Sequence, residues 1–265
     1  MMFVTGDCHG DYRRFNVKNF PQQKEMTKDD YVIVCGDFGY WLPSKAREHD
    51  MDELEQRSFT TLFVDGNHED YDSLNSLPVE EWNGGKVHKI RKSVIHLMRG
   101  QYYMIGGKTV FTFGGAASHD VQGGIFDVLD IERCRKKETI TAKDIVPEEL
   151  MYYYYDEANY VPYRVNHVSW WKEEVPTEEE FLEGVENLKA HGNKVDFVFS
   201  HDGPSSDVAI YSHGEVKADD TRRYLEEFRV LLFDNYEGWY FGHHHDNHRI
   251  TAKDTLLYEK IIQIA

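Results

Sequence analysis

The strongest constraint on the fold of this chain is a series of five short apolar runs that each end in a polar cluster. Their length and β-branched content indicate buried strands. The helix-compatible segment 44–59, between the second and third runs, favours an α/β fold with parallel strand pairing. The runs and their clusters are 3–5 with Gly6-Asp7, 31–35 with Gly36-Asp37, 62–64 with Asp65-Gly66-Asn67-His68, 195–199 with Ser200-His201, and 238–241 with Gly242-His243-His244-His245.

These clusters are expected to meet, because in open α/β sheets the ligand site lies beyond the carboxyl ends of the strands. Asp7 and His9 are two residues apart, as are His243 and His245, so each pair faces one way in extended backbone. Carboxylate, imidazole and amide oxygen together suit divalent Mn, Fe or Zn. Seven ligands are too many for one tetrahedral ion and fit two ions about 3.5–4 Å apart that share a carboxylate. The candidates are Asp7, His9, Asp37, Asn67, His201, His243 and His245.

The charge balance argues against several kinds of partner. Thirty Lys and Arg residues against 47 Asp and Glu residues give a net charge of −17, which disfavours non-specific binding to nucleic acid or anionic membranes. No apolar run reaches membrane-spanning length, and the N-terminus does not resemble a signal peptide. Three cysteines are too few for a disulfide framework and favour a reducing compartment. We therefore expect a cytoplasmic protein, and the sequence leaves its oligomeric state open.

The 265 residues suffice for one large domain or two small ones. Short β-rich runs in 87–113, split by glycines, predict hairpins with antiparallel pairing. From about 123 to 162 the composition becomes charged and tyrosine-rich, which indicates an insertion or lid rather than sheet. We predict a single domain over 1–265 with an insertion at about 121–176. Further predicted elements are helices over 178–191 and 219–233, a strand in each of 195–199 and 238–241, and two closing strands over 248–264.

The five polar clusters, in this order over residues 6–245, resemble the motif blocks of the calcineurin-like metallophosphoesterase family, and in particular its bacterial and phage members. One block such as Gly66-Asn67-His68-Glu69 would be a weak signal, whereas five in order at the ends of apolar runs are a strong one. The resemblance implies a four-layer α/β/β/α sandwich with a dinuclear metal site at one edge of its sheets.

The resemblance also implies a role for each residue. Asp7, His9 and His245 would bind the first metal, Asn67, His201 and His243 the second, and Asp37 would bridge the two. His68 would be catalytic, as general acid or transition-state stabiliser. A water bridging the metals would become hydroxide near neutral pH and attack phosphorus in line. Among Mn, Fe and Zn, Mn is the ion expected to support activity in vitro.

One block departs from the family pattern. Tyr40 stands where the family has an Asp that orients the catalytic His, and the Arg that often follows is also absent, so phosphate recognition is unassigned. The segment 114–120 and the later Arg164 with Trp170-Trp171 resemble a pattern of bacterial and phage members in which the Asp and Arg lie closer together. Candidate substrate contacts are therefore Arg164, His119 and Asp120.

Three functions are compatible with the sequence. The first is a phosphoesterase that acts on a small soluble phosphorylated molecule, either a monoester or a diester. The second is a protein Ser/Thr phosphatase, against which the missing Asp and Arg count. The third is a non-catalytic module that keeps metals for structure. Two side issues stay open: whether Cys8 and Cys35 pack beside the site or form a redox-sensitive pair, and whether 152–155 and 170–171 form a ring-binding platform or pack the insertion.

Overall fold

A computed structural model describes residues 1–129, 154–156, 159–215 and 219–265 of the chain. Its larger sheet has seven strands, of which the four central ones run parallel and the edge strands antiparallel. The parallel strands include the three N-terminal runs predicted from the sequence. The order is β17 (Ile262–Gln263), β1 (Met2–Thr5), β2 (Tyr31–Cys35), β3 (Thr60–Val64), β6 (Val94–Leu97), β5 (Gly85–Arg91) and β4 (Val79–Trp82).

The second sheet has six strands and contains the two C-terminal apolar runs. β8, β13, β14 and β16 are parallel, whereas β7 and β15 close the two edges in antiparallel register. The predicted hairpin in 87–113 is confirmed as the β7–β8 pair. The order is β15 (His248–Arg249), β16 (Asp254–Leu256), β14 (Gly238–Phe241), β13 (Phe197–Ser200), β8 (Lys108–Phe113) and β7 (Gln101–Ile105).

The two sheets pack face to face, because alternate residues of each strand point to opposite faces. In β2, Ile33 joins an apolar cluster that also contains Val110 and Phe199 of the second sheet. The neighbouring Val32 faces the other way, into a separate cluster with Met51 of α1 (Lys45–Glu55). A buried layer therefore lies between the sheets, and a second one lies between the larger sheet and α1.

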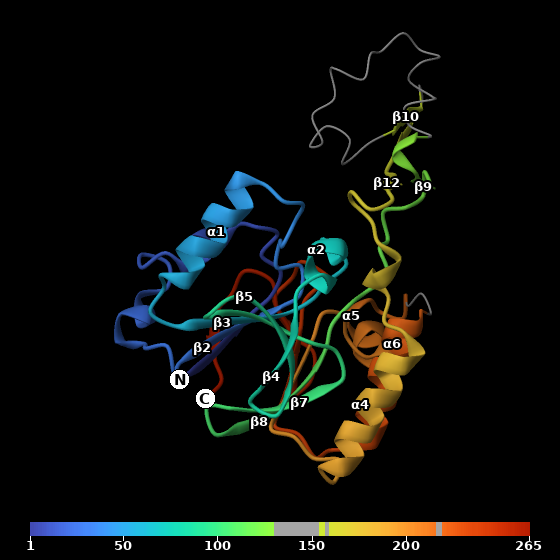
Figure 1. Ribbon diagram of the computed structural model, residues 1–265. Helices are drawn as coiled ribbons and strands as arrows, with labels where there is room; N and C mark the ends of the chain where they lie inside the picture. Colours follow the sequence, from blue (N-terminus) through green and yellow to red (C-terminus); the bar gives the residue numbers. More distant parts are fainter. Residues whose placement is uncertain (130–153, 157–158, 216–218) are drawn as a thin grey trace.

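A third apolar cluster covers the outer face of the second sheet. Phe111 and Trp239 of the sheet pack there with Phe228 of α6 (Asp220–Leu232) and Leu188 of α4 (Glu178–Ala190). α4 begins at a capping box in which Thr177 and Glu180 satisfy each other's backbone N–H groups. Figure 1 shows α1 on one side of the sheets and α4 and α6 on the other, so the predicted α/β/β/α sandwich is confirmed.

Short helices complete the described chain. Two lie near the carboxyl ends of the strands, and three are 3₁₀ turns. None of the helices in the described ranges is both long and apolar enough to cross a membrane. The short helices are α2 (Tyr71–Asn75), α5 (Ser205–Tyr211), η1 (Tyr12–Phe15), η2 (Pro21–Glu25) and η4 (Lys172–Glu174).

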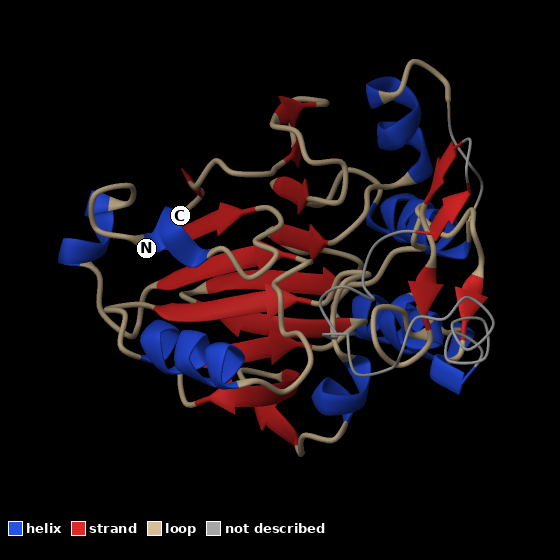
Figure 2. Ribbon diagram, turned by 90° about the horizontal axis from the view of Figure 1, so that it is seen from above, coloured by secondary structure: helices blue, strands red, loops and turns tan. Residues whose placement is uncertain are grey.

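Two sequence expectations need correction. The tail forms three short strands rather than two: β15 and β16 lie in the second sheet, and β17 pairs with β1 of the first. The segment 121–176 is not free of sheet, because β9 (Ile125–Phe126) pairs with β12 (Arg164–Val165), and β10 (Tyr154–Asp156) pairs with β11 (Asn159–Val161). Figure 2 shows these short pairs beside the sandwich rather than within it. Residues 130–153 and 157–158 lie outside the described residues, so the single-domain boundaries and the lid stay predictions.

Candidate metal centre

The candidate ligands lie in tight loops directly after parallel strands of both sheets. Four of them have left-handed backbone, with φ angles of 47°, 43°, 69° and 49° for His9, Asp37, His243 and His245. Such angles are uncommon outside glycine and cost of the order of 1 kcal/mol or more each. Backbone strain at four candidate ligands indicates that these loops adopt the conformation that places the side chains, rather than the one that the backbone favours.

Two glycines show why the motif blocks need this residue beside the polar ones. Gly36 has φ +84°, and a Cβ built on it would lie 2.1 Å from Nδ1 of His201. A Cβ on Gly66 would lie 2.1 Å from Oδ1 of Asp37. Both contacts are far inside van der Waals distance, so any larger residue would push a candidate ligand away.

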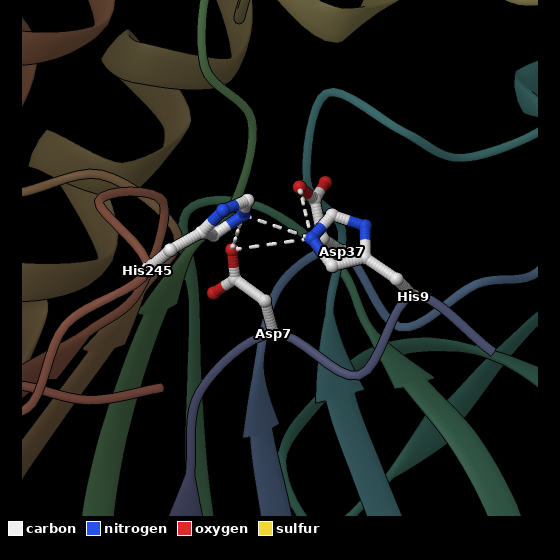
Figure 3. A group of neighbouring side chains, drawn as sticks. All are labelled: Asp7, His9, Asp37 and His245. Carbon is white, nitrogen blue, oxygen red and sulfur yellow. Dashed lines mark hydrogen bonds and ion pairs between the residues drawn. The ribbon is translucent and has the colours of Figure 1, made fainter. Parts of the chain in front are cut away.

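The first group of side chains contains Asp7, His9, Asp37 and His245, whose ligand atoms all lie within 4.8 Å of one another. Figure 3 shows the two imidazoles and the two carboxylates pointing toward one another. Nε2 of His9 is 2.9 Å from Nε2 of His245, which is in turn 3.2 Å from Oδ2 of Asp7. The hydrogen bond to Asp7 raises the pKa of His245. This donor set suits a borderline divalent cation.

The second group forms around the buried His201. Its Nε2 lies 3.1 Å from Oδ1 of Asn67 and 3.4 Å from Oδ1 of Asp37. The ring of His243 lies 5.0 Å from the His201 ring, centroid to centroid. Asp37 faces both groups, because its other oxygen, Oδ2, lies 3.7 Å from Nε2 of His9. A carboxylate with one oxygen toward each group is placed as a bridge would be.

The second group needs a cation. Nδ1 of His201 donates to the carbonyl oxygen of Cys35, so the lone pair of Nε2 faces two oxygens that also only accept. Burial alone would lower the pKa of His201, but the carboxylates of Asp37 and Asp7 raise it to about 9. Either a proton or a metal ion at Nε2 would supply the positive charge that these oxygens favour.

The other pKa shifts at the site have clear causes. Burial alone would raise the pKa of Asp37, but His201, His68 and His9 hold it well below the usual carboxyl range. Burial lowers the pKa of His243 to about 3, which keeps its imidazole neutral as metal binding requires. The backbone N–H of His243 donates to Oδ1 of Asp7 at 3.0 Å. This bond ties a loop of the second sheet to one of the first.

Two side chains, the half-buried Arg14 and the buried Glu69, hold the strained loops in place. Arg14 donates to the carbonyl oxygens of Asp7 and Tyr258, both at 2.6 Å, and the Tyr258 ring stacks on His245 at 4.9 Å. Glu69 accepts three backbone N–H groups of the loop after β2, from Phe38, Gly39 and Tyr40. Neither role was assigned from the sequence, although Glu69 stands in a motif block.

His68 lies next to the metal groups, with its ring centroid 5.5 Å from that of His9. Nη2 of Arg164 is 3.3 Å from Nε2 of His68, and Nε of Arg164 donates to Oδ1 of Asp120 at 2.9 Å. Burial lowers the pKa of His68 to about 4, so the metal-free imidazole is neutral and accepts from Arg164. The fold thus brings together two candidate substrate contacts that are 44 residues apart in sequence.

Tyr40 does not reach His68 by any hydrogen bond described in the structure. It is buried, and the Arg47 guanidinium lies over its ring at 4.4 Å. The charged groups beside His68 include Asp37, whose Oδ1 accepts the His68 backbone N–H at 2.9 Å, and Arg164 with its partner Asp120. A guanidinium and a carboxylate therefore lie near His68, although Tyr40 supplies neither.

Two further histidines, His119 and His244, differ in the groups that they contact. The ring of His119 lies 5.8 Å from that of His243, at the border of the second group. His244 turns away from its neighbours and contacts Oδ1 of Asp202 at 3.1 Å. Ser118 contacts both Asn67 and Glu174, and the sequence assigned no role to either Ser118 or Glu174.

The cysteines beside the site are poor candidates for redox chemistry. Both Cys8 and Cys35 are buried and free. Burial raises the pKa of Cys8 to about 12 and that of Cys35 well above its usual value, so neither carries a thiolate near neutral pH. The packing interpretation therefore fits them better.

Some residues of the open sequence questions lie outside the described ranges, namely Cys134, Tyr152 and Tyr153. Trp171 is described and buried, and its Nε1 donates to Asp72.

Comparisons with known proteins give one family and two individual similarities. Lariat debranching enzyme A of Xenopus laevis is 28% identical over 140 residues, which are 47% of this chain and 25% of that protein. A Staphylococcus aureus structure assigned as a 5′-nucleotidase matches 97% of this chain and 48% of its own, with a TM-score of 0.46 and 13% identity. The chain thus spans a quarter of the first protein and about half of the second. The sequence pattern of the calcineurin-like phosphoesterases matches residues 2–247, and the chain therefore belongs to this family of metal-dependent phosphoesterases.

Proposed function

We propose that this chain hydrolyses a phosphoester of a small soluble molecule with the help of two divalent metal ions. The observation that carries the proposal is the convergence of acceptor atoms on two adjacent points with Asp37 between them. Such a cluster is electrostatically unfavourable unless cations neutralise it. Membership of the phosphoesterase family gives this cluster its chemistry.

The residues present fit two ions. Asp7, His9 and His245 would hold one and Asn67, His201 and His243 the other, with Asp37 shared. Mn²⁺, Fe²⁺ and Zn²⁺ all accept this mixture of oxygen and imidazole nitrogen, and Mn²⁺ is our choice for activity in vitro. When bound, such ions would lower the pKa of a coordinated water and neutralise charge on phosphoryl oxygens.

His68 and Arg164 act on the phosphoryl group itself in this proposal. The planar guanidinium of Arg164 is a good partner for phosphate oxygens, and its contact with Asp120 fixes its orientation. We expect the phosphoryl group to take the donor that Nη2 now offers to His68. The negative charge of the phosphoryl group would then favour a proton on Nε2 of His68, which the leaving oxygen needs.

The charge of the site favours a small substrate over a long polyanion. Two divalent cations against the carboxylates of Asp7 and Asp37 leave a local charge of about +2, although the whole chain carries −17. A single phosphate is attracted by the local charge. A polyanion that extends beyond the site would meet the acidic surface and be repelled.

The test compares hydrolysis of p-nitrophenyl phosphate, bis-p-nitrophenyl phosphate and a phosphopeptide by the full chain with added Mn²⁺. We expect turnover of at least one small ester. Asp37→Ala should abolish it together with the loss of bound metal. His68→Ala should lower kcat about 10²–10⁴-fold while metal content stays near that of the wild type. His49→Ala, an exposed histidine on α1, is the matched control and should change neither quantity.

The other functions are outcomes of the same assay. Turnover of the phosphopeptide alone would indicate a protein phosphatase. No turnover of any ester by protein that demonstrably holds two metal ions would refute catalysis and indicate a metal-containing binding module. Loss of metal in His68→Ala would show that this residue is a ligand rather than a catalytic group.

A further inference from the structure

A chain of hydrogen bonds leads from the candidate ligand Asn67 to a carboxylate in the segment that follows the insertion. Nδ2 of Asn67 donates to Oγ of Ser118 at 3.2 Å. Oγ of Ser118 lies 2.8 Å from Oε2 of Glu174, and the Ser118 backbone N–H donates to Oε1 at 2.7 Å. Glu174 ends η4 and is only 2% exposed. A buried carboxylate that spends both oxygens on one serine fixes the hydroxyl of that serine.

The direction of this chain decides which atom Asn67 presents to a metal. An ionised carboxylate only accepts, so the hydroxyl hydrogen of Ser118 points to Glu174 and its lone pairs face Asn67. Only the NH₂ group of the Asn67 amide can satisfy those lone pairs. The amide oxygen must then face His201, from which it lies 3.1 Å. Because NH₂ cannot ligate a cation, this choice of amide rotamer is the difference between a ligand and a repulsive group.

We propose that Glu174 and Ser118 are positioning residues that hold the Asn67 amide with its oxygen toward the second metal ion. The proposal rests on the metal-dependent function proposed above and adds two residues that touch neither metal nor substrate. Backbone contacts keep the carboxylate in place, since Arg99 donates to the Glu173 carbonyl at 2.8 Å and is itself paired with Asp65. The segment after the insertion is thereby connected to the metal site.

The Glu174→Gln variant tests the donor-to-acceptor direction of these hydrogen bonds rather than whether the hydrogen bonds are present. The carbamoyl group of Glu174→Gln has one acceptor, which can serve either the backbone N–H or the hydroxyl of Ser118, but not both. When the N–H takes it, the NH₂ faces Oγ and the hydroxyl hydrogen turns to Asn67. That arrangement favours the flipped amide with Nδ2 toward the second metal ion.

The structure provides a control at a second serine–carboxylate pair. Oε2 of Glu55 on α1 accepts both the backbone N–H of Ser93 at 2.7 Å and its hydroxyl at 2.5 Å, so one oxygen serves where Glu174 uses two. Glu55→Gln therefore removes a carboxylate charge beside a serine away from Asn67, and its amide oxygen can keep both hydrogen bonds. Ser118→Ala removes the link, and Ser118→Thr keeps a hydroxyl at the same position.

The experiment measures Mn²⁺ bound to the full chain by equilibrium dialysis at pH 8, above the pKa of about 7 to which burial raises Glu174. For Glu174→Gln and Ser118→Ala we expect one of two Mn²⁺ ions to bind about 10–100-fold more weakly, with the other unchanged. Ser118→Thr and Glu55→Gln should bind both as the wild type does. Urea unfolding of each metal-free variant measures any loss of stability separately.

Two results overturn the inference. If Glu174→Gln loses stability but binds two Mn²⁺ ions with wild-type affinity, Glu174 is only structural. If both ions weaken equally, Glu174 supports the whole site rather than the Asn67 amide. A wild type that itself binds no Mn²⁺ refutes the proposed function, and the inference falls with it, so the two failures are distinguishable.

Discussion

The pair of Arg164 and Asp120 predicts two variants whose losses of stability and of activity rank in opposite order. The Arg164 side chain is 3% exposed, whereas that of Asp120 is 29% exposed. Removal of the carboxylate takes a counter-charge from a buried guanidinium that cannot leave the protein interior. Removal of the guanidinium leaves a carboxylate that water can reach. The two members of one ion pair therefore differ in what their loss costs.

The difference in burial between Arg164 and Asp120 determines how much stability each variant loses. Breaking a fully buried pair from one side costs about 3–5 kcal/mol, and the partial exposure of Asp120 places Asp120→Ala below this range, at about 2–3 kcal/mol of unfolding free energy. Arg164→Ala should cost about 1 kcal/mol. Activity follows the opposite order, because Arg164 reaches His68. Loss of a preorganised donor lowers kcat by about 10²–10³-fold, and Asp120→Ala, which keeps the cation, should lose less.

Urea unfolding of the metal-free protein and hydrolysis of p-nitrophenyl phosphate measure the two effects. The double variant should recover about 1–2 kcal/mol relative to Asp120→Ala, because no buried charge is left. The exposed pair of Arg91 and Asp52, 2.7 Å apart, is the control, and either single variant there should change stability by less than about 1 kcal/mol. Equal stability of Asp120→Ala and Arg164→Ala, or higher activity of Arg164→Ala than of Asp120→Ala, would refute this reasoning.

Three further predictions concern buried groups. Cys8 and Cys35 should stay unlabelled by iodoacetamide in folded protein, because burial raises the pKa of both thiols, and mass spectrometry should find them labelled only in urea. Glu69→Gln should lower the unfolding free energy by about 2–3 kcal/mol in urea titrations, because its NH₂ would face backbone N–H groups. Burial raises the pKa of Asp207 to about 6 against the pull of Arg229. Since this exceeds the unfolded value, protonated Asp207 stabilises the folded state. This contribution is complete below about pH 4 and is lost as the pH rises through about 6, a fall of about 3 kcal/mol. Asp207→Asn should abolish this fall in urea titrations at pH 4 and pH 7.

Each of these predictions has a result that contradicts it. Rapid labelling of Cys8 before unfolding would show that its thiol is accessible. Wild-type stability in Glu69→Gln would show that the loop after β2 does not depend on two acceptor oxygens at this position. An unchanged dependence of stability on pH in Asp207→Asn would assign that dependence to other carboxyl groups.

The five strand-end clusters could be predicted because their information is local. An apolar run predicts a strand, the Gly and polar residues after it predict a tight loop, and parallel pairing brings the loops to one edge. β4 could not be found in this way, because Val79 and its acidic neighbours lie exposed on an edge strand and show no apolar alternation. The start of α5 could not be predicted either, because Pro204 provides no side-chain cap.

The groups beside His68 were harder to predict because they depend on distant pairing. Sequence resemblance suggested Arg164 and Asp120 as phosphate contacts, but only the β9–β12 pair shows how the chain returns across the insertion to bring them together. The relation of Ser118 to Glu174 gives no signal of its own, since a serine and a glutamate 56 residues apart form no periodic or spaced pattern. Residues that act through another side chain are thus found from geometry.

The strain at the candidate ligands and the acceptor cluster that they form have one physical explanation. The candidate ligands bring carboxylates and imidazoles close together, and four of these residues have left-handed backbone. Local sequence preference opposes both. The opposing free energy comes from the three apolar layers of the sandwich and from ties such as Arg14 and Glu69, which join the loops of neighbouring strands. The packed sandwich and these ties therefore stabilise loop conformations that local backbone preference alone would not favour.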